Sequence, residues 1–143
     1  MQKKRIAAID YGKKRIGISI TSPDGKIALP YKTIDTGKNL EESSNNIINS
    51  LNPYIENIKE IVLGNPLFLS GKESEMSKEV TKLKAILSKK LNIPIILWDE
   101  RLTSSEAEKI LKEQKIPRKK RKRKVDPIAA TIILRSYLDA KKI

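Results

Sequence analysis

Acidic side chains occur at three separated points of the sequence where they could carry out chemistry. Asp10 ends one apolar segment, Asp99 and Glu100 end another, and Asp126 begins an amphipathic C-terminal segment. Because sites in open α/β sheets gather at the carboxyl ends of strands, we expect these acids to meet at one sheet edge. A bound metal would neutralise such a cluster, and a pair of divalent ions is a known means of hydrolysing phosphodiester bonds. The pattern therefore favours metal-assisted phosphodiester hydrolysis.

Each acid also has a purely structural interpretation. Asp10 could lie in a turn at the end of a strand, and Asp126 could cap a helix. Asp99 or Glu100 could form an ion pair with Arg101. Only their convergence would distinguish a site from three unrelated acids.

The chain contains no His and no Cys. This composition excludes disulfides, thiolate zinc sites and every mechanism that needs a histidine. A site made of carboxylates favours hard ions such as Mg2+ or Mn2+. The lack of Cys is typical of an intracellular protein, and we expect a cytoplasmic location. No apolar stretch approaches the roughly 20 residues of a transmembrane helix, and no secretory signal is recognisable, so no membrane partner is expected.

The length of 143 residues predicts a single domain, residues 1–143. The hydrophobic fraction is 38%, but the aromatic fraction is only 4%, so the core should be mainly aliphatic. The formal net charge of +13 favours a polyanionic partner.

A run of cations at residues 115–124 has a charge of +8, which is most of the net charge of +13. Its basic members are Lys115, Arg118, Lys119, Lys120, Arg121, Lys122, Arg123 and Lys124, with no acid among them. Such a run can be a solvated loop, but its position between predicted elements favours contact with nucleic acid. It lacks the hydrophobic face that a membrane-surface helix needs.

Hydrophobic periodicity predicts the elements that must position these residues. Residues 5–10, 15–21 and 26–34 predict three strands in a meander. The later predicted elements are a helix from residue 40 with a break at Asn52-Pro53, a strand at 58–64, a helix around 80–91, a strand at 93–98, a helix from Thr103 and a last helix at 126–142. The run 93–98 has no polar face, which is typical of a central parallel strand. This order predicts an α/β fold with a mixed five-stranded sheet and helices on its faces.

Four blocks of the sequence resemble the YqgF (RuvX) family, a bacterial group associated with pre-16S rRNA cleavage and with Holliday junction resolution. The blocks are residues 10–17 (DYGKKRIG), 62–67 (VLGNPL), 98–103 (WDERLT) and 126–130 (DPIAA), the last followed by Leu134 and by Tyr137-Leu138-Asp139. They occur in family order and span nearly the whole chain, and the third block is highly specific.

The resemblance implies an RNase H-like fold and a metal site formed by Asp10, Glu100 and Asp126. Adjacent strand residues point to opposite faces, so only one of Asp99 and Glu100 should face the metal, and we expect Glu100. Junction resolvases of the RuvC type, which share the fold, carry a further acid three residues after the last one. This chain has Ala129 there, so a site of four carboxylates is not expected.

Several cations are candidates for holding substrate phosphates. Lys13, Lys14 and Arg15 follow Asp10 and are expected beside the flanking phosphates, with solvated turn residues as the alternative. Arg101 could pair with the scissile phosphate, or simply with a neighbouring acid. The predicted backbone-binding residues of the basic run are Arg118, Lys119, Lys120, Arg121, Lys122, Arg123 and Lys124. The segment Gly64-Asn65-Pro66 should line the same cleft.

The leading hypothesis from the sequence is a Mg2+- or Mn2+-dependent endonuclease acting on structured RNA. The resemblance points to the 5′ end of pre-16S rRNA, and so to the ribosome or its precursor as a partner. The alternatives are a Holliday junction resolvase acting on DNA and a non-catalytic factor that binds nucleic acid or the ribosome. A resolvase needs two active sites related by a dimer axis, so monomer and homodimer both remain open.

Overall fold

The computed structural model of the 143-residue chain describes residues 2–66, 70–100 and 127–141. The strands are β1 (Arg5–Tyr11), β2 (Arg15–Thr21), β3 (Ala28–Asp35), β4 (Ile58–Asn65) and β5 (Ile95–Asp99). The helices are α1 (Leu40–Leu51), a 3-10 helix η1 (Asn52–Asn57), α2 (Glu75–Lys90) and α5 (Ile128–Lys141). The helix predicted from Thr103 and the basic run at 115–124 lie outside the described residues.

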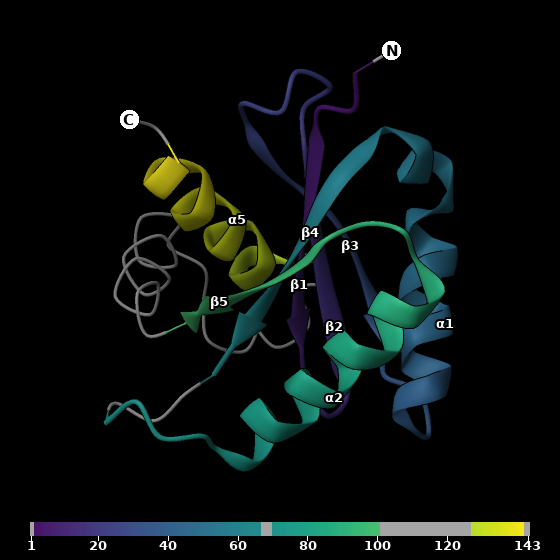
Figure 1. Ribbon diagram of the computed structural model, residues 1–143, viewed down its shortest axis with the longest axis vertical. Coiled ribbons are helices and arrows are strands. Elements are labelled where there is room, and N and C mark those ends of the chain that lie inside the picture. The colour runs from purple at the N-terminus through teal and green to yellow at the C-terminus, as the bar shows by residue number, and fades with distance from the viewer. Residues whose placement is uncertain (1, 67–69, 101–126, 142–143) are drawn as a thin grey trace, which may run out of the picture.

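One five-stranded sheet organises the molecule, with the order β3-β2-β1-β4-β5 (Figure 1). The pairs β1–β2 and β2–β3 are antiparallel, whereas β1–β4 and β4–β5 are parallel. The meander followed by parallel crossovers confirms the mixed sheet that periodicity predicts. Since β1, β4 and β5 run in the same direction, their carboxyl ends meet at one edge.

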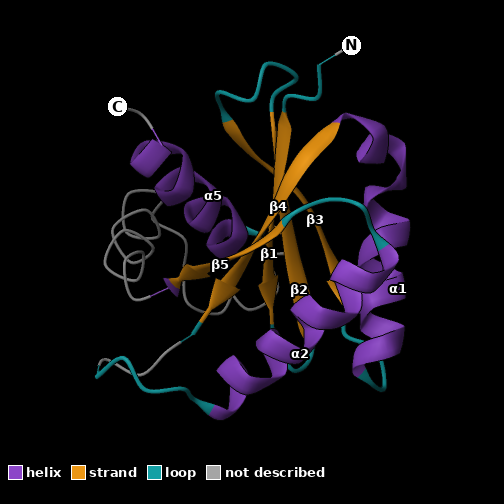
Figure 2. Ribbon diagram, viewed as in Figure 1, coloured by secondary structure: helices purple, strands orange, loops and turns teal. Residues whose placement is uncertain are grey.

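Helices cover both faces of this sheet, with α1 and α2 on one side and α5 on the other (Figure 2). On the α1/α2 face, the core contains Ile9 of β1 and Leu63 of β4. On the α5 face, Ala8 and Val62 pack against helix residues that include Tyr137. Strand residues therefore alternate between two apolar cores, and the sheet is buried on both sides.

Strand β5 corrects one expectation from the sequence. The apolar run 93–98 predicts a central strand, but β5 lies at the edge of the described sheet, beside β4 only. Its apolar character has another cause. Leu97 packs into the α1/α2 core and Ile96 and Trp98 pack into the α5 core, so both faces of an edge strand are covered. The pattern of apolar residues in a strand indicates which of its two faces are buried, but it does not indicate how many strands pair with it.

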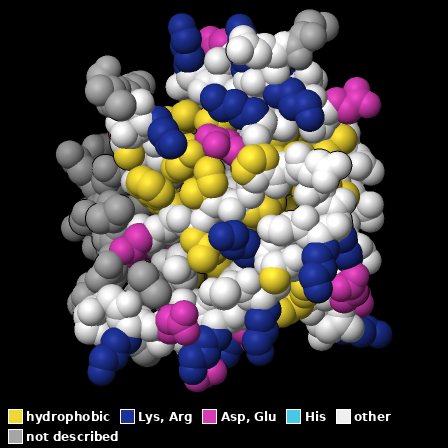
Figure 3. All heavy atoms as spheres, viewed as in Figure 1, with side chains coloured by type: hydrophobic (Ala, Val, Ile, Leu, Met, Phe, Trp, Pro, Cys, Tyr) yellow, Lys and Arg dark blue, Asp and Glu magenta, His cyan; other side chains and the backbone are white. Residues whose placement is uncertain are grey.

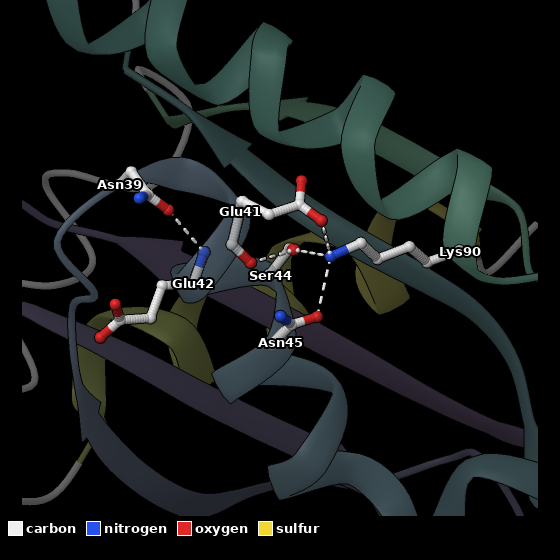
Figure 4. A network of polar contacts seen from close by, with 6 residues as sticks. All are labelled: Asn39, Glu41, Glu42, Ser44, Asn45 and Lys90. Carbon is white, nitrogen blue, oxygen red and sulfur yellow. Dashed lines mark hydrogen bonds and ion pairs between the residues drawn. The ribbon is translucent and has the colours of Figure 1, made fainter.

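A polar cluster ties α1 to α2 (Figure 4). Lys90 Nζ, at the end of α2, donates to Ser44 Oγ and to Asn45 Oδ1, each at 2.8 Å, and also forms an ion pair with Glu41. Asn39 caps the start of α1 by accepting from the backbone N–H of Glu42 at 2.8 Å. The two helices of this face are thus held together at their polar margin.

Helix α5 is fixed to three strands. Ser19 Oγ donates to the carbonyl of Ala130 at 2.8 Å, and Trp98 Nε1 donates to Ser136 Oγ at 3.1 Å. The Tyr137 hydroxyl donates to Glu60 Oε1 at 2.8 Å, and its ring meets Trp98 edge to face with centroids 5.3 Å apart. These contacts fix where α5 begins, at the carboxyl edge of the sheet. Within the described ranges, no helix is long and apolar enough to cross a membrane.

Candidate active site

Asp10 and Glu100 come together on the α5 face of the sheet. Asp10 alternates in phase with Ala8, which belongs to the core under α5, and so projects toward that helix. Glu100 follows β5 directly, and its carboxyl forms a hydrogen bond with that of Asp10. The two acids come from residues 90 positions apart in the sequence. Their meeting is the convergence that distinguishes a site from isolated acids.

Gly64 of β4 makes this meeting possible. A Cβ atom built on Gly64 would lie 2.8 Å from Glu100 Oε1 and 2.7 Å from Ile133 Cδ1, closer than real Cβ contacts. The Glu100 carboxyl therefore lies against the β4 backbone, in space that any other residue would fill. The backbone of Gly64 does not have a positive φ, so the requirement for glycine is one of space and not of conformation.

The start of α5 lies close to the same pair. Asp10 is opposite Gly17 in the β1–β2 register, and a Cβ on Gly17 would lie 3.2 Å from Pro127 Cβ. Pro127 immediately precedes the helix. The absence of a side chain at Gly17 thus lets the helix start pack beside the strand position that faces Asp10. Asp126, the third predicted ligand, lies outside the described residues.

Burial and repulsion shift the pKa values of both carboxyls. The pKa of Glu100 is raised to about 8, chiefly by burial and then by the charge of Asp10, by the hydrogen bond to Asp10 and by the charge of Asp99. Burial also raises the pKa of Asp10, and the hydrogen bond from Glu100 opposes that rise. The direction of these effects indicates that protonated Glu100 donates to ionised Asp10. Without a cation, the pair shares one negative charge.

Asp99 lies in phase with Leu97, which packs into the α1/α2 core. Strand alternation therefore directs Asp99 to the face opposite Asp10 and Glu100. Asn65 is opposite Asp99 in the β4–β5 register, and its Oδ1 is buried with no hydrogen-bond partner in the described structure. Of the two adjacent acids, Glu100 is the one that meets Asp10.

The turn after β1 carries the cations expected near phosphate. Lys13 and Lys14 lie on the turn that connects Asp10's strand to β2, Arg15 is the first residue of β2, and all three are exposed. Thr36 braces this turn, since its Oγ1 donates to the carbonyl of Gly12 at 2.7 Å and its N–H donates to that of Lys14 at 3.0 Å. Arg101 and the cations at 118–124 lie outside the described residues.

The donor set suits a hard divalent ion. The described part of the site offers two carboxylates and no nitrogen or sulfur ligand, and the chain has neither His nor Cys. Among the described residues no group of three acids that could hold a metal is found. Two half-buried carboxylates that share a proton are the kind of site where a bound cation would replace that proton.

The sequence pattern did not identify the role of Gly64. The segment Gly64-Asn65-Pro66 was expected to line the cleft, and a glycine at a strand end normally indicates a turn. In the structure Gly64 lies within β4, beneath Glu100. No signal in a single sequence tells a glycine required by a neighbouring side chain from one required by a turn.

A mixed five-stranded sheet with an acid pair at its carboxyl edge defines the class of RNase H-like proteins. Two solved structures share this fold. The Thermus thermophilus RuvC structure matches with a TM-score of 0.56 and 11% identity, over 95% of this chain and 96% of that one. T. thermophilus RuvC in complex with a Holliday junction substrate matches with a TM-score of 0.53 and 14% identity, over 96% of each chain.

The chain belongs to the RuvX family, whose model is described as "Holliday junction resolvase" and matches residues 4–140. Curated relatives extend over nearly the same length. A protein of Protochlamydia amoebophila is 40% identical over 96% of this chain and 94% of its own length. A protein of Chlamydia pneumoniae is 44% identical over 96% of this chain and 91% of its own length. Both relatives carry the name "Putative pre-16S rRNA nuclease".

The shared proton of the acid pair predicts how stability depends on pH in the presence of a chelator. Because the folded pKa of Glu100 is raised to about 8 from 4.5, the folded state retains a proton that the unfolded chain releases. This contribution to stability is complete below pH 4.5 and is lost as the pH rises to 8. Glu100→Gln removes the titrating group and keeps an N–H donor for Asp10.

Urea unfolding with EDTA at pH 5, 7 and 9 checks this expectation. We expect the variant to match the parent at pH 5 and to exceed it at pH 9, by a few kcal/mol at most, since each tenfold change in proton affinity is worth about 1.4 kcal/mol. Parallel pH profiles for the two proteins would show that Glu100 carries no raised pKa.

Gly64→Ala is expected to displace the Glu100 carboxyl, since the new methyl group occupies its place. The fold should survive, with a loss of about 1–3 kcal/mol, because both obstructing groups are ends of flexible side chains. The affinity for Mn2+, measured by calorimetry, should fall roughly 10- to 100-fold.

The double variant Gly64→Ala/Ile133→Val is the matched control, because it removes the Cδ1 atom and leaves only the conflict with Glu100. The affinity for Mn2+ should remain low in this variant. Full recovery would assign the defect to the packing of α5 instead.

Proposed function

We propose that this chain is a divalent-metal-dependent endonuclease that hydrolyses phosphodiester bonds of structured nucleic acid. The observation that carries the proposal is the half-buried, hydrogen-bonded Asp10–Glu100 pair at the carboxyl edge of an RNase H-like sheet. Membership of the RuvX family supports a nuclease, and hence a hydrolase. The names of the curated relatives support pre-16S rRNA as the substrate. Cleavage at its 5′ end, during ribosome biogenesis in the cytoplasm, is part of the proposal.

Asp10, Glu100 and Asp126 are the ligands in this proposal, within a single domain of residues 1–143. Asp126 is bonded directly to Pro127, which packs against Gly17, the cross-strand partner of Asp10. Oxygen donors alone favour Mg2+ or Mn2+ over softer metals. When bound, such ions would supply an activated water and stabilise the charge that develops on the phosphate. The chain's own part is to hold the ligands on one face and to keep that face apolar around them.

Substrate phosphates would be held by cations around the same edge. Lys13 and Lys14 on the turn after Asp10's strand, and Arg15 at the start of β2, are exposed and so accessible to a large ligand. Arg101 and the cations of residues 118–124 complete the proposed set. Contacts of this kind position the backbone without reading its sequence.

Junction cleavage is the second candidate, favoured by the description of the family model and by the RuvC fold. Hydrolysis at the carboxylates is the same for RNA and DNA, so the substrate and the assembly distinguish the two. A resolvase would act as a homodimer with paired sites, whereas trimming of rRNA needs one site on a monomer. A binding factor without catalysis is the third possibility, and the intact acid pair argues against it.

Asp10→Asn tests the proposal directly. The substitution removes a metal ligand and a negative charge near phosphate, so cleavage should be lost while affinity for the substrate stays equal or increases. Purified parent and variant would be incubated with pre-16S rRNA fragments and with four-way junction DNA, each with Mg2+, Mn2+ or EDTA. Cleavage by the variant at the parental rate would refute a mechanism centred on Asp10.

Glu100 and Asp99 form a matched pair for a second test, because they are adjacent acids on opposite faces of the sheet. We expect Glu100→Gln to abolish cleavage and Asp99→Asn to retain measurable activity, since only Glu100 meets Asp10. Rates with saturating Mn2+ check the order. The reverse ranking would mean that Asp99, and not Glu100, serves the reaction.

A further inference from the structure

Two clefts flank α5, the larger at its C-terminal end and the smaller along its length from Thr131 to Asp139. The larger, of about 530 Å3, lies between α5 and the start of β4, where Lys26, Lys59 and Lys141 surround Glu60. The smaller, of about 390 Å3, lies between α5 and the start of β3 and includes Lys26 and Arg135. Lys26 and Leu138 line both clefts, so they form one continuous surface, here called the distal surface.

The distal surface carries four cations, Lys26, Lys59, Arg135 and Lys141, and two acids, Glu60 and Asp139. Asp24 lies beside Lys26 and accepts its backbone N–H at 3.0 Å. Within the described ranges, Lys26, Lys59 and Arg135 form no ion pair, and Lys141 Nζ lies 5.3 Å from the centroid of the Tyr137 ring. The acid in the larger cleft, Glu60, already accepts the hydroxyl of Tyr137. Figure 3 shows cations gathered around an apolar patch with an acidic group in its middle, at the end of the molecule where the N-terminus lies.

Two further cations adjoin the larger cleft. A Cβ built on Gly25 would meet the carbonyl oxygen of Lys4, so the N-terminal segment with Lys3 and Lys4 runs beside the turn that lines this cleft. Both lysines are exposed. The distal surface thus extends onto a neighbouring segment of the same charge.

Helix α5 connects the distal surface to the candidate active site. Its first residues pack beside Gly17, opposite Asp10, and its last described residue is Lys141. With 14 residues at 1.5 Å each, the helix is about 21 Å long. A B-form DNA duplex advances 3.4 Å per base pair, so about six of its base pairs separate the two ends, and an A-form RNA duplex, whose rise is smaller, fits slightly more.

We propose that the distal surface binds the phosphate backbone of a duplex arm of the substrate, about six base pairs from the phosphate at the acid pair. This inference rests on the proposed nuclease function and adds a second, sequence-independent contact to it. Spaced lysines with few hydrogen-bonding partners are suited to backbone phosphates and not to bases. Ile27 and Leu29 are the exposed large hydrophobic residues among those described, and Ile27 lines the smaller cleft, so binding to lipid vesicles is included as an arm of the test below.

A charge-matched pair of triple variants tests the proposal. Lys26→Gln, Lys59→Gln and Lys141→Gln together remove three cations from the distal surface. The control removes three from the exposed side of α2, on the opposite face of the sheet, through Lys78→Gln, Lys82→Gln and Lys89→Gln. Melting curves of both variants show that the fold is retained.

Binding would be measured in EDTA by fluorescence anisotropy across a salt series. The probes are RNA hairpins from pre-16S rRNA whose duplex arm extends 4 or 14 base pairs. For the long arm we expect the distal variant to lose roughly tenfold in affinity and its salt slope to fall by about 2. For the short arm its affinity should change less than about twofold, and the control variant should resemble the parent with both probes.

Equal loss in the two triple variants, or equal loss for the two arm lengths, would overturn the proposal, since either result indicates general charge attraction. Unchanged RNA binding with lost binding to phosphatidylserine vesicles would overturn it in favour of a lipid surface. The nuclease proposal fails separately, if the parent does not cleave with Mg2+ or Mn2+. Because binding is measured without metal, the affinities for the two arm lengths could still be compared if the parent did not cleave.

Discussion

The structure depends on one electrostatic constraint, which is that two half-buried carboxyls from distant parts of the sheet are held in contact. Strands β1 and β5 are not neighbours, since β4 lies between them. At about 4.8 Å per strand, their backbones are roughly 10 Å apart. Glu100 bridges that separation by lying across β4, and it can do so because Gly64 has no side chain. A glycine in the middle strand thus decides whether acids on its two neighbours form a pair.

Helix α5 closes the face on which this pair lies. Its contacts come from β2 through Ser19, from β5 through Trp98 and from β4 through Glu60, which accepts the hydroxyl of Tyr137. Each is a hydrogen bond made by a residue at the margin of an apolar core. Because hydrogen bonds require a particular geometry, they fix the position of the helix more closely than apolar burial alone would. The same helix carries Ile133 against Gly64 and begins at Pro127 beside Gly17. The same packing contacts therefore determine the positions of both the acid pair and helix α5.

Local patterns in the sequence predict much of this arrangement. Alternating Ile16, Ile18 and Ile20 predict β2 with the bounds that the structure shows, because a half-buried strand needs apolar residues at every second position. The same alternation predicts that Glu100, and not Asp99, shares a face with Asp10. Its role as a metal ligand, like that of Asp126, stays a prediction.

Two features could not be predicted, since each depends on what lies beside a segment. The edge position of β5 depends on strand pairing, which apolar content does not report. The need for Gly64 depends on a side chain 36 positions later in the chain.

The order of the strands has a consequence for when the acid pair forms during synthesis. The β1–β3 meander is local and is complete within the first 35 residues, so Asp10 is placed early. Its hydrogen-bond partner is encoded 90 residues later, and α5 later still. At about 5–20 residues per second, the ribosome needs roughly 5–20 seconds to supply Glu100 after Asp10. The nascent chain therefore carries only one member of its acid pair until Glu100 has been synthesised, and the pair cannot form before then.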